Sequence, residues 1–553
     1  MTFLRSTSRP APRRTSHTRS LRWTSLAVAS ALAPFLSGCR VGPKYTTPAP
    51  PPPALTYKEG MPQQYQGVSA GTWKPANPQD AVLKGKWWEI FNEPELNALE
   101  EQLNINNQNI AQYFQNFMAA RALVRQARSQ LFPTVTVDPS YLRTKSSGAL
   151  HGFGTASTGS GTSTGGGTGT GGTGGTGTGG TTTTTVTATG GTSTDLSLPF
   201  DVSWEPDLWG RVRNEVREYQ YAAQVSAADL ENERLTEQAD LAEYYFELRG
   251  QDALQDLYNK TIQAYKQSLQ LTQALVETGI DSPESTAQAE VTLRDAEEAA
   301  AGVAQNRAIY EHAIATLIGK PASSFSMPVR GLTTPIPAIP VGVPSELLQR
   351  RPDVAAAERT MAEANALIGV EKAAYYPTLS LSGSGGLESS SISSLFSIPA
   401  LFWSLGASAQ QILFDAGLRN ATVAEYTAQY NADVAAYRQT VLTAFQQVED
   451  YIATLRVTSD QDIREQAAVE AAQRYFDIAM ARYKTGLDPY LDVITAQTTL
   501  LSNQQTQVTL RVNEMTAAVE LIQALGGGWN ANQLPSAATI TSNAAATKVA
   551  NTQ

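Results

Sequence analysis

The strongest constraint on the fold is a helical run of about 70 residues that contains no proline. This run extends from Gly210 to Gly279. At 1.5 Å per residue, one continuous helix of this length is roughly 100 Å long, which exceeds the diameter of a compact globular domain. The chain is therefore expected to form an elongated and mostly helical structure.

The same run occurs a second time, 207 positions further along the chain and without a gap. Each copy ends at a glycine, and an aspartate and a proline follow at once, so that one helix ends and the next begins at a sharp reversal. Asp488 is predicted to be an N-cap and Pro489 the first residue of the returning helix. The sequence thus predicts two helical hairpins. Their tips contain Gly279, Asp281, Ser282 and Glu284 in the first hairpin, and Gly486, Leu487 and Asp488 in the second.

Shorter elements precede each long helix. Helical patterns over 95–130 and 345–374 end before Pro133 and Pro377. Alternating apolar and polar residues over 196–204 predict a strand with one apolar face. Further strands are expected over 134–142, 378–381 and 401–414. Residues 154–192 are almost wholly Gly, Thr and Ser, which predicts a flexible loop inserted in the first β-hairpin.

The N-terminus has the features of an export signal. A basic segment and a short apolar run are followed by Leu36-Ser-Gly-Cys39, which resembles a bacterial lipoprotein signal. Cleavage after residue 38 and acylation of Cys39 are expected, and an ordinary cleaved signal peptide is the alternative. The residue after the cysteine is Arg40, whereas bacterial lipoproteins that stay in the inner membrane have an aspartate there. This resemblance therefore indicates the outer membrane. The proline-rich residues 39–86 are predicted to form an extended tether.

Composition excludes several classes of function. The net charge of −10 argues against nucleic acid as a partner. The single cysteine and three scattered histidines provide no metal site, and no nucleophile, acid pair or phosphate loop has the context that catalysis needs. We therefore expect no enzyme activity, no cofactor and no metal.

Four amphipathic strands are too few to close a barrel around a pore, for which eight is the usual minimum. A sheet in lipid must close, because every backbone group needs a partner there. Several chains are therefore expected to share one barrel. A lipid-anchored periplasmic coiled-coil rod with a structural or adhesive role remains the alternative.

Several motifs together resemble the TolC-like outer-membrane efflux proteins, in their NodT-type, OprM-like lipoprotein branch. The first motif is the segment that begins at Cys39. The others are Trp87-Trp88, Trp204-Glu-Pro-Asp-Leu-Trp-Gly-Arg211, Val343-Pro-Ser-Glu-Leu-Leu-Gln-Arg-Arg-Pro-Asp353 and Ala524-Leu-Gly-Gly-Gly-Trp529. The resemblance implies a mostly α, α+β homotrimer, with a 12-stranded outer-membrane β-barrel continued by a periplasmic α-helical barrel. Its two efflux repeats are expected at 87–319 and 345–529, with an equatorial linker at 320–344 and a disordered tail at 530–553.

The function that this resemblance implies is passive export of drugs or other small molecules across the outer membrane. The partners would be a periplasmic adaptor and an inner-membrane pump of the resistance-nodulation-division class. The tips would contact the adaptor and form the gate, where Tyr483 and Asp492 match the family's gate tyrosine and aspartate. Asp488 stands where some members have an arginine, and Thr495 replaces a second aspartate. Without the resemblance, Asp492 is a solvated helix-start aspartate.

Overall fold

The computed structural model describes residues 40–52, 57–59, 85–145, 192–339, 344 and 347–542. The chain forms two compact units. The helical unit contains residues 1–130, 207–376 and 412–553, and the sheet unit contains residues 131–206 and 377–411. Cys39 and nearly all of the Gly/Thr-rich loop lie outside the described residues, so what the sequence indicates for them stays a prediction.

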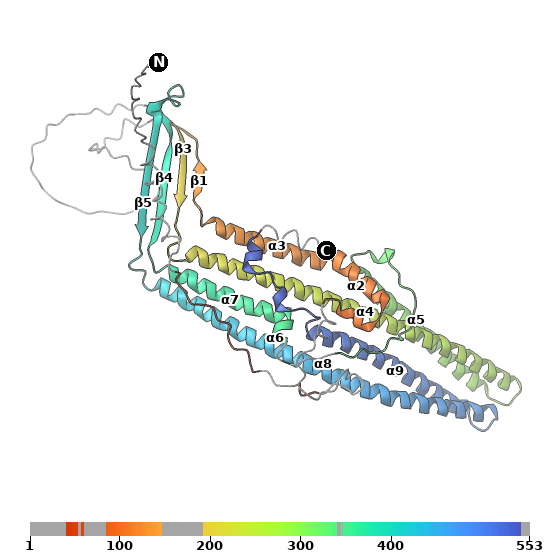
Figure 1. The fold of residues 1–553 in the computed structure, drawn as a ribbon. Coiled ribbons are helices and arrows are strands. Elements are labelled where there is room, and N and C mark those ends of the chain that lie inside the picture. Colours follow the sequence, from red (N-terminus) through yellow and green to blue (C-terminus); the bar gives the residue numbers. More distant parts are fainter. Residues whose placement is uncertain are drawn as a thin grey trace, which may run out of the picture. The chain divides into compact units, whose positions relative to one another are not determined.

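Two long helical hairpins form the helical unit (Figure 1). Helices α4 (Arg211–Glu277) and α8 (Leu418–Lys484) each contain 67 residues. Each is followed by a helix of 35 residues, α5 (Pro283–Leu317) or α9 (Tyr490–Ala524). Gly279 and Gly486 both have φ of 73°, a left-handed conformation that glycine adopts without steric cost. The predicted repeat and both reversals are therefore confirmed.

The shorter helices differ from prediction because each is broken once. The pattern over 95–130 forms α2 (Pro94–Asn106) and α3 (Gln108–Ser129), and Asn107 between them caps α3 by accepting from the amide of Ile110. The pattern over 345–374 forms α6 (Leu347–Arg350) and α7 (Pro352–Ala373). Pro352 explains this second break, because proline disfavours a helical conformation at the residue before it.

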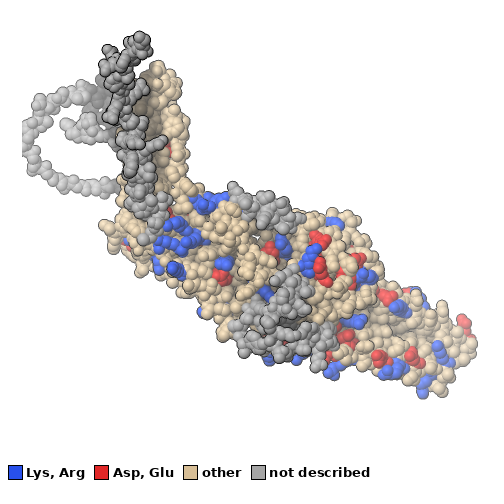
Figure 2. Space-filling model, viewed as in Figure 1, with Lys and Arg blue, Asp and Glu red and all other residues tan. Residues whose placement is uncertain are grey.

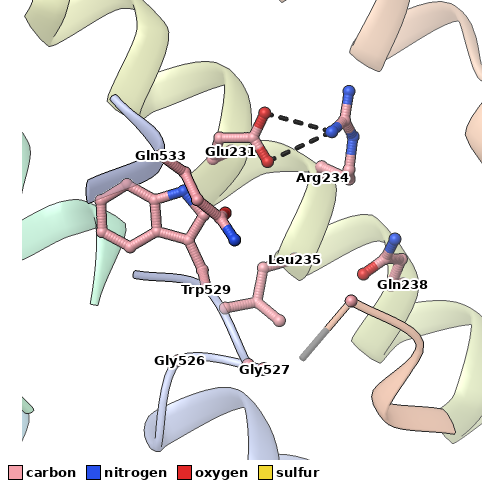
Figure 3. Close-up of a pocket in the computed structure, with 10 residues that line it drawn as sticks. Glu231, Arg234, Leu235, Gln238, Gly526, Gly527, Trp529 and Gln533 are labelled. Atoms are coloured by element: carbon pink, nitrogen blue, oxygen red, sulfur yellow. Dashed lines mark hydrogen bonds and ion pairs between the residues drawn. The ribbon is translucent and has the colours of Figure 1, made fainter. Parts of the chain in front are cut away.

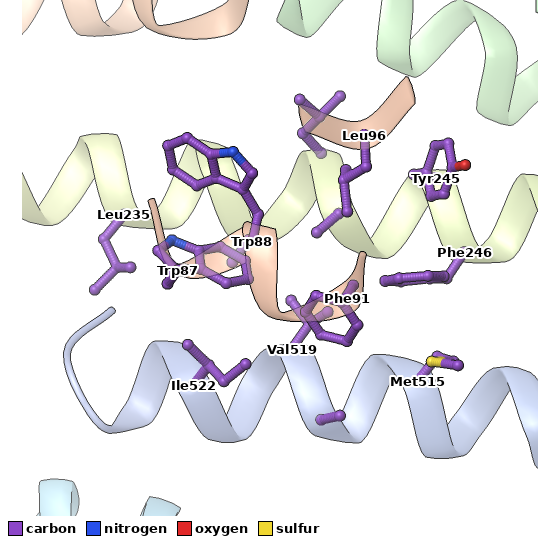
Figure 4. Close-up of a cluster of buried hydrophobic side chains, with 14 of the residues drawn as sticks. Trp87, Trp88, Phe91, Leu96, Leu235, Tyr245, Phe246, Met515, Val519 and Ile522 are labelled. Atoms are coloured by element: carbon purple, nitrogen blue, oxygen red, sulfur yellow. The ribbon is translucent and has the colours of Figure 1, made fainter. Parts of the chain in front are cut away.

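Aromatic rings fill the core of the helical unit. Trp87, Trp88 and Phe91 lie on the short helix η4 (Trp87–Phe91) and are buried against side chains of α4 and α9, including Phe246 and Val519 (Figure 4). The rings of Phe91 and Phe246 have centroids 5.0 Å apart. Large rings suit this place because they fill the space between helices that smaller side chains would leave open.

The C-terminal segment corrects one prediction. Residues 530–553 were expected to be disordered, but η8 (Ala531–Gln533) and α10 (Ala537–Thr541) are ordered. Ile540 is buried beside Val124 and Ala223, and Arg121 donates to the carbonyl oxygens of Ile540 and Ser542. The prediction is wrong for residues 530–542, because these contacts hold the segment on α3 and α4. Residues 543–553 lie outside the described part of the chain.

The sheet unit is an antiparallel sheet with four strand positions. Its elements are β1 (Thr134–Val137), β2 (Ser140–Lys145), β3 (Thr192–Trp204), β4 (Thr378–Ser389) and β5 (Leu401–Gln410). Both β1 and β2 pair with β3, so they are two pieces of one strand, and the order continues through β4 to β5. The short helices η5 (Ala322–Ser324) and η7 (Ile398–Ala400) lie in connecting segments.

Several strand boundaries differ from the prediction. The first strand ends at Lys145 rather than at Leu142, and β3 begins at Thr192 rather than at Leu196. The third strand continues through Ser389 rather than ending at Leu381, and the fourth ends at Gln410 rather than at Phe414. Gly386 explains part of the extension of β4. A Cβ atom there would lie 2.2 Å from the carbonyl oxygen of Leu198 on β3, so a glycine is required for this pairing.

Large apolar side chains on the sheet are exposed. They include Val135 and Tyr141 on the first strand, Phe200 and Val202 on β3, and Leu401, Trp403 and Leu405 on β5, where Trp403 is 74% exposed. Burial of such side chains in an apolar environment contributes roughly 1.5–3 kcal/mol each. An isolated sheet of this kind therefore requires an apolar covering.

No helix in the described part of the chain is both long and apolar enough to cross a membrane.

Candidate functional site at the two helical tips

The tips of the two hairpins are joined by an apolar contact. Tyr483 near the end of α8 and Tyr490 at the start of α9 are buried, and their ring centroids lie 5.1 Å apart. Ala289 of α5 and Val493 of α9 belong to the same cluster, with Leu275 of α4 packed against it. This cluster brings together residues that lie about 200 positions apart in the sequence.

One hydrogen bond links the two tips directly. The hydroxyl of Tyr483 donates to Oδ2 of Asp281 at 2.6 Å. The other carboxylate oxygen of Asp281 accepts from the hydroxyl of Ser285 at 2.8 Å and from the amide of Ser282 at 2.7 Å. Partial burial raises the pKa of Asp281, but these hydrogen bonds outweigh it and leave the pKa below its usual value. Burial and the hydrogen bond to Asp281 raise the pKa of Tyr483. The pair is thus a neutral phenol donating to an ionised carboxylate.

Buried polar side chains continue this contact along the helices. The hydroxyls of Ser268 on α4 and Tyr490 on α9 are 3.2 Å apart, and Nε2 of Gln497 donates to Ser268 at 3.4 Å. Thr272 lies 3.4 Å from the hydroxyl of Tyr483. Sequence reasoning missed these four residues. They are ordinary polar residues within helices rich in such residues, and only their pairing across the two hairpins distinguishes them.

The second tip contains an ion pair that the sequence did not predict. Nε and Nη2 of Arg482 donate to the two carboxylate oxygens of Asp488 at 2.5 and 2.8 Å. This bidentate hydrogen bonding lowers the pKa of Asp488. The prediction that Asp488 caps α9 is wrong by one position, because Pro489 is the N-cap and α9 begins at Tyr490. Arg482 draws the Asp488 side chain back toward α8.

The other predicted tip residues lie around this contact. Gly279, Ser282, Glu284, Gly486 and Leu487 are exposed, which leaves them accessible to another protein. Ser282 is the N-cap of α5 without a side-chain capping bond.

The two remaining predicted gate residues lie on α9. Asp492 is partly exposed in the first turn of α9, and its charge acts on Arg482. The hydroxyl of Thr495 donates to the carbonyl oxygen of Leu491 at 2.9 Å, so this side chain is bonded within its own helix. Neither residue takes part in the hydrogen bond between Tyr483 and Asp281.

A buried ionic cluster holds the linker between the repeats. Asp252 of α4 accepts from Nη1 of Arg249 at 3.0 Å, from Nε of Arg307 at 2.6 Å and from the amide of Arg330 at 3.0 Å. Asp252 is 2% exposed. Arg330 also pairs with Glu93. Arg249 and Arg307 also donate to the carbonyl oxygens of Pro328 and Met327, and Thr334 bonds to Glu93 at the N-cap of α2. Residues 327–334 are therefore attached to α2, α4 and α5, so the cluster is structural and determines where the linker runs.

Several pockets open on the described part of the helical unit. One of about 170 Å³ is lined by Leu235, Trp529 and Gln533, and by Glu231 and Arg234, which pair at 3.1 Å (Figure 3). Among the described residues, no group of three or more His, Cys, Asp or Glu side chains could hold a metal ion.

Comparison with known proteins agrees with this architecture. The family model "Outer membrane efflux protein" matches residues 99–320 and 343–527, which are most of the chain and span both hairpins. The antibiotic efflux pump outer membrane protein ArpC of Pseudomonas putida is 30% identical over 509 residues, covering 91% of this chain and 96% of that protein.

Two further relatives extend the comparison. The pyoverdine export outer membrane protein OpmQ of Pseudomonas aeruginosa is 28% identical over 501 residues, covering 90% of this chain and 97% of that protein. The solved structure of the outer-membrane channel OprN superposes with a TM-score of 0.74 at 27% identity, covering 89% of this chain and all of that one.

Proposed function

This chain belongs to the outer membrane efflux protein family, and from that premise we propose how it works as the outer-membrane channel of an efflux pump. The observation that carries this function is that one chain combines two long helical hairpins with a sheet of four strand positions. The family model matches both repeats, and the solved channel structure matches the same architecture. The protein is a non-enzymatic channel. It exports drugs or other small molecules passively, with the energy supplied by the pump.

The channel is a homotrimer with a 12-stranded barrel. Within one chain, β1, β2 and β5 are edge strands, and an edge leaves backbone groups without partners. Three copies of four strand positions close a barrel of ordinary size, in which the exposed Trp403 and Phe200 contact lipid. Mass measurement of the detergent-solubilised protein tests this, with a trimer as the expected result and a monomeric rod as the contradicting one.

The periplasmic mouth lies at the helical tips, where the Tyr483–Asp281 hydrogen bond holds the two hairpins of each chain together. Breaking this bond frees the α8–α9 hairpin to move away from α4–α5. Three copies of Asp492 place a ring of carboxylates at the mouth, which favours cations in transit. Asp488 stands where some members of the family have an arginine, and here the Arg482–Asp488 ion pair holds its side chain within one tip.

The same tips contact the periplasmic adaptor, through which a resistance-nodulation-division pump is joined. Leu487 and Ile280 occupy equivalent positions in the two repeats and are 69% and 66% exposed. Exposed apolar side chains at the end of a helical hairpin suit packing against another helical protein. Gly279, Gly486, Ser282 and Glu284 form the polar rest of this surface.

The N-terminus is anchored in lipid through Cys39. Arg40, the next residue, is held by α4, because its Nε donates to Oδ1 of Asn214 at 2.7 Å. The amide of Val41 donates to the carbonyl oxygen of Trp209 at 3.0 Å. Cys39→Ser should abolish fatty-acid labelling of the protein. Continued labelling of this variant would show that Cys39 is not the site of acylation, and it would leave the proposed channel function unaffected.

A further inference from the structure

The ends of four helices lie level with one another at one end of the helical unit. Nε2 of Gln130, after α3, donates to Glu215 of α4 at 2.9 Å. Trp209, before α4, stacks on Tyr376, after α7, with ring centroids 4.8 Å apart. Arg419, in the first turn of α8, donates to the carbonyl oxygen of Ala374 at 3.4 Å. The ends of α3 and α7 and the starts of α4 and α8 therefore form one continuous rim.

The part of this rim at the end of α3 carries positive charges that have no acidic residue within their own helix. Figure 2 shows Lys and Arg side chains gathered where α3 ends and α4 begins. The sequence contains no acidic residue between Glu101 and Asp138, whereas the whole chain has a net charge of −10. Burial, and then the charge of Arg125, lower the pKa of Arg121. The end of α3 is thus a basic segment in an acidic protein.

Four basic side chains here, which we call the basic rim, are Lys44, Arg125, Arg128 and Lys372. None of their charged groups has a hydrogen bond or an ion pair with another residue in the described part of the chain. Arg213 and Arg419 at the same end behave differently, because they pair with Asp207 at 3.0 Å and with Asp415 at 2.5 Å. The free charges of the basic rim are therefore available to a ligand that is anionic.

Exposed apolar side chains lie at the same end of the helical unit. Leu413 and Phe414, before α8, are 90% and 87% exposed, and Leu418 in its first turn is also exposed. Tyr375 and Tyr376 are exposed beside them. Basic groups next to aromatic and aliphatic groups match the boundary of a bilayer, where phosphate headgroups lie above acyl chains. An acidic protein surface would satisfy the charges but would leave these apolar groups in water.

We propose that the basic rim binds the headgroups of anionic phospholipid in the periplasmic leaflet of the outer membrane. The proposal rests on the placement of the channel in that membrane and adds a lipid preference that the channel function alone does not require. Each Lys or Arg near an anionic membrane surface contributes about 1 kcal/mol, or roughly fivefold in binding.

The test uses the full-length, delipidated protein in detergent. Phosphatidylglycerol and phosphatidylcholine with the same acyl chains are added in equal amounts, and the bound lipid is counted by native mass spectrometry. We expect the wild type to retain phosphatidylglycerol preferentially. The variant Arg125→Gln/Arg128→Gln/Lys372→Gln should lose this preference by at least about tenfold.

The matched control is Arg438→Gln/Arg474→Gln/Arg511→Gln, which removes the same charge from exposed positions elsewhere on α8 and α9. The control should retain the wild-type preference. A rim variant that keeps the preference, or a control that loses it equally, overturns the proposal. If millimolar inorganic phosphate displaces the lipid completely, the site is one for free phosphate and the lipid assignment is wrong.

If the rim variant fails to assemble, a second measurement on the wild-type protein tests the proposal. Headgroup binding by exposed charges must weaken when salt shortens the Debye length from about 10 Å to about 3 Å. An unchanged preference for phosphatidylglycerol over that range overturns the proposal. Conductance in a planar bilayer separates the two claims, because a rim variant that conducts normally keeps the channel function whatever its lipid preference.

Discussion

The hydroxyl of Tyr483 donates to the carboxylate of Asp281 across the two hairpins of one chain, 202 positions apart in the sequence. The donor lies in the last turn of α8, and the acceptor lies in the turn between α4 and α5. No other direct hydrogen bond is seen between the turn at 278–282 and the second hairpin in the described residues. Opening of the mouth in our account requires this bond to break.

Replacing Tyr483 by phenylalanine removes the donor and keeps the ring in its apolar cluster. A hydrogen bond to a charged group contributes about 1.5–3 kcal/mol, so the open state should gain roughly tenfold or more in population. Single-channel conductance and the leak of large antibiotics into cells should both rise. Tyr475→Phe, on an exposed tyrosine of α8, is the control and should change neither. An unchanged leak in Tyr483→Phe would show that this bond does not hold the mouth closed.

Replacing Asp492 by alanine removes one carboxylate per chain from the start of α9. If three copies form a ring, the permeability ratio of potassium to chloride should fall by severalfold. Reversal potentials in a salt gradient measure this ratio. Asp477→Ala removes the same charge from α8, where Asp477 accepts from Gln473 of its own helix, and should leave selectivity unchanged. Equal effects of both substitutions would mean that general charge, rather than a ring at Asp492, sets selectivity.

Replacing Asp252 by alanine leaves Arg249 and Arg307 without their shared carboxylate. Loss of one partner from a buried ion pair costs about 3–5 kcal/mol. The variant should therefore melt at a much lower temperature and expose the linker at 327–334 to protease. Asp256→Ala is the control, because Asp256 is exposed and pairs with Lys260 on the surface. A melting temperature equal to that of the control would refute the structural role of the cluster.

Glu243 makes stability depend on pH. Burial, and then the charges of Glu520, Asp240 and Glu247, raise its pKa to about 7. The folded protein therefore binds more protons than the unfolded chain between about pH 4.5 and 7, so stability falls as pH rises through that window. The shift in pKa corresponds to an upper limit of about 3 kcal/mol in the free energy of unfolding. Solvent screening reduces the actual contribution, because the side chain is partly exposed.

Glu243→Gln should accordingly raise the melting temperature at pH 8 and have little effect at pH 4.5. Melting curves of both proteins over this range measure the difference. Glu470→Gln, at an exposed position of α8, should follow the wild type at every pH. A Glu243→Gln protein that parallels the wild type throughout would exclude Glu243 as the source of the pH dependence.

Backbone geometry explains what could be predicted from the sequence. Gly279 and Gly486 must adopt positive φ to reverse a helix, so their positions alone located both tips. The break at Asn107 was not predicted, because it depends on its side chain capping Ile110 and bonding to Glu237 of another helix. The extension of β4 was not predicted, because its glycine and serine residues have no strand pattern of their own. Gly386 is a strand residue only because it pairs with β3.

The candidate site was harder to predict than the fold. The sequence singled out Tyr483 as a predicted gate residue and Asp281 as a residue of the other tip, but the bond between them depends on how two distant hairpins pack. Asp488 was assigned to α9 because aspartate caps helices well, whereas Arg482 on the previous helix binds both of its oxygens. The contacts of Ser268 and Gln497 likewise exist only in the assembled hairpins.

Conductance of the purified wild-type protein in a planar bilayer tests the central claim most directly. A trimeric channel predicts discrete current steps that are cation-selective and that grow larger in Tyr483→Phe. A protein that assembles stably in detergent, inserts into the bilayer and yet passes no current in either form would contradict the account, and would favour the lipid-anchored periplasmic rod.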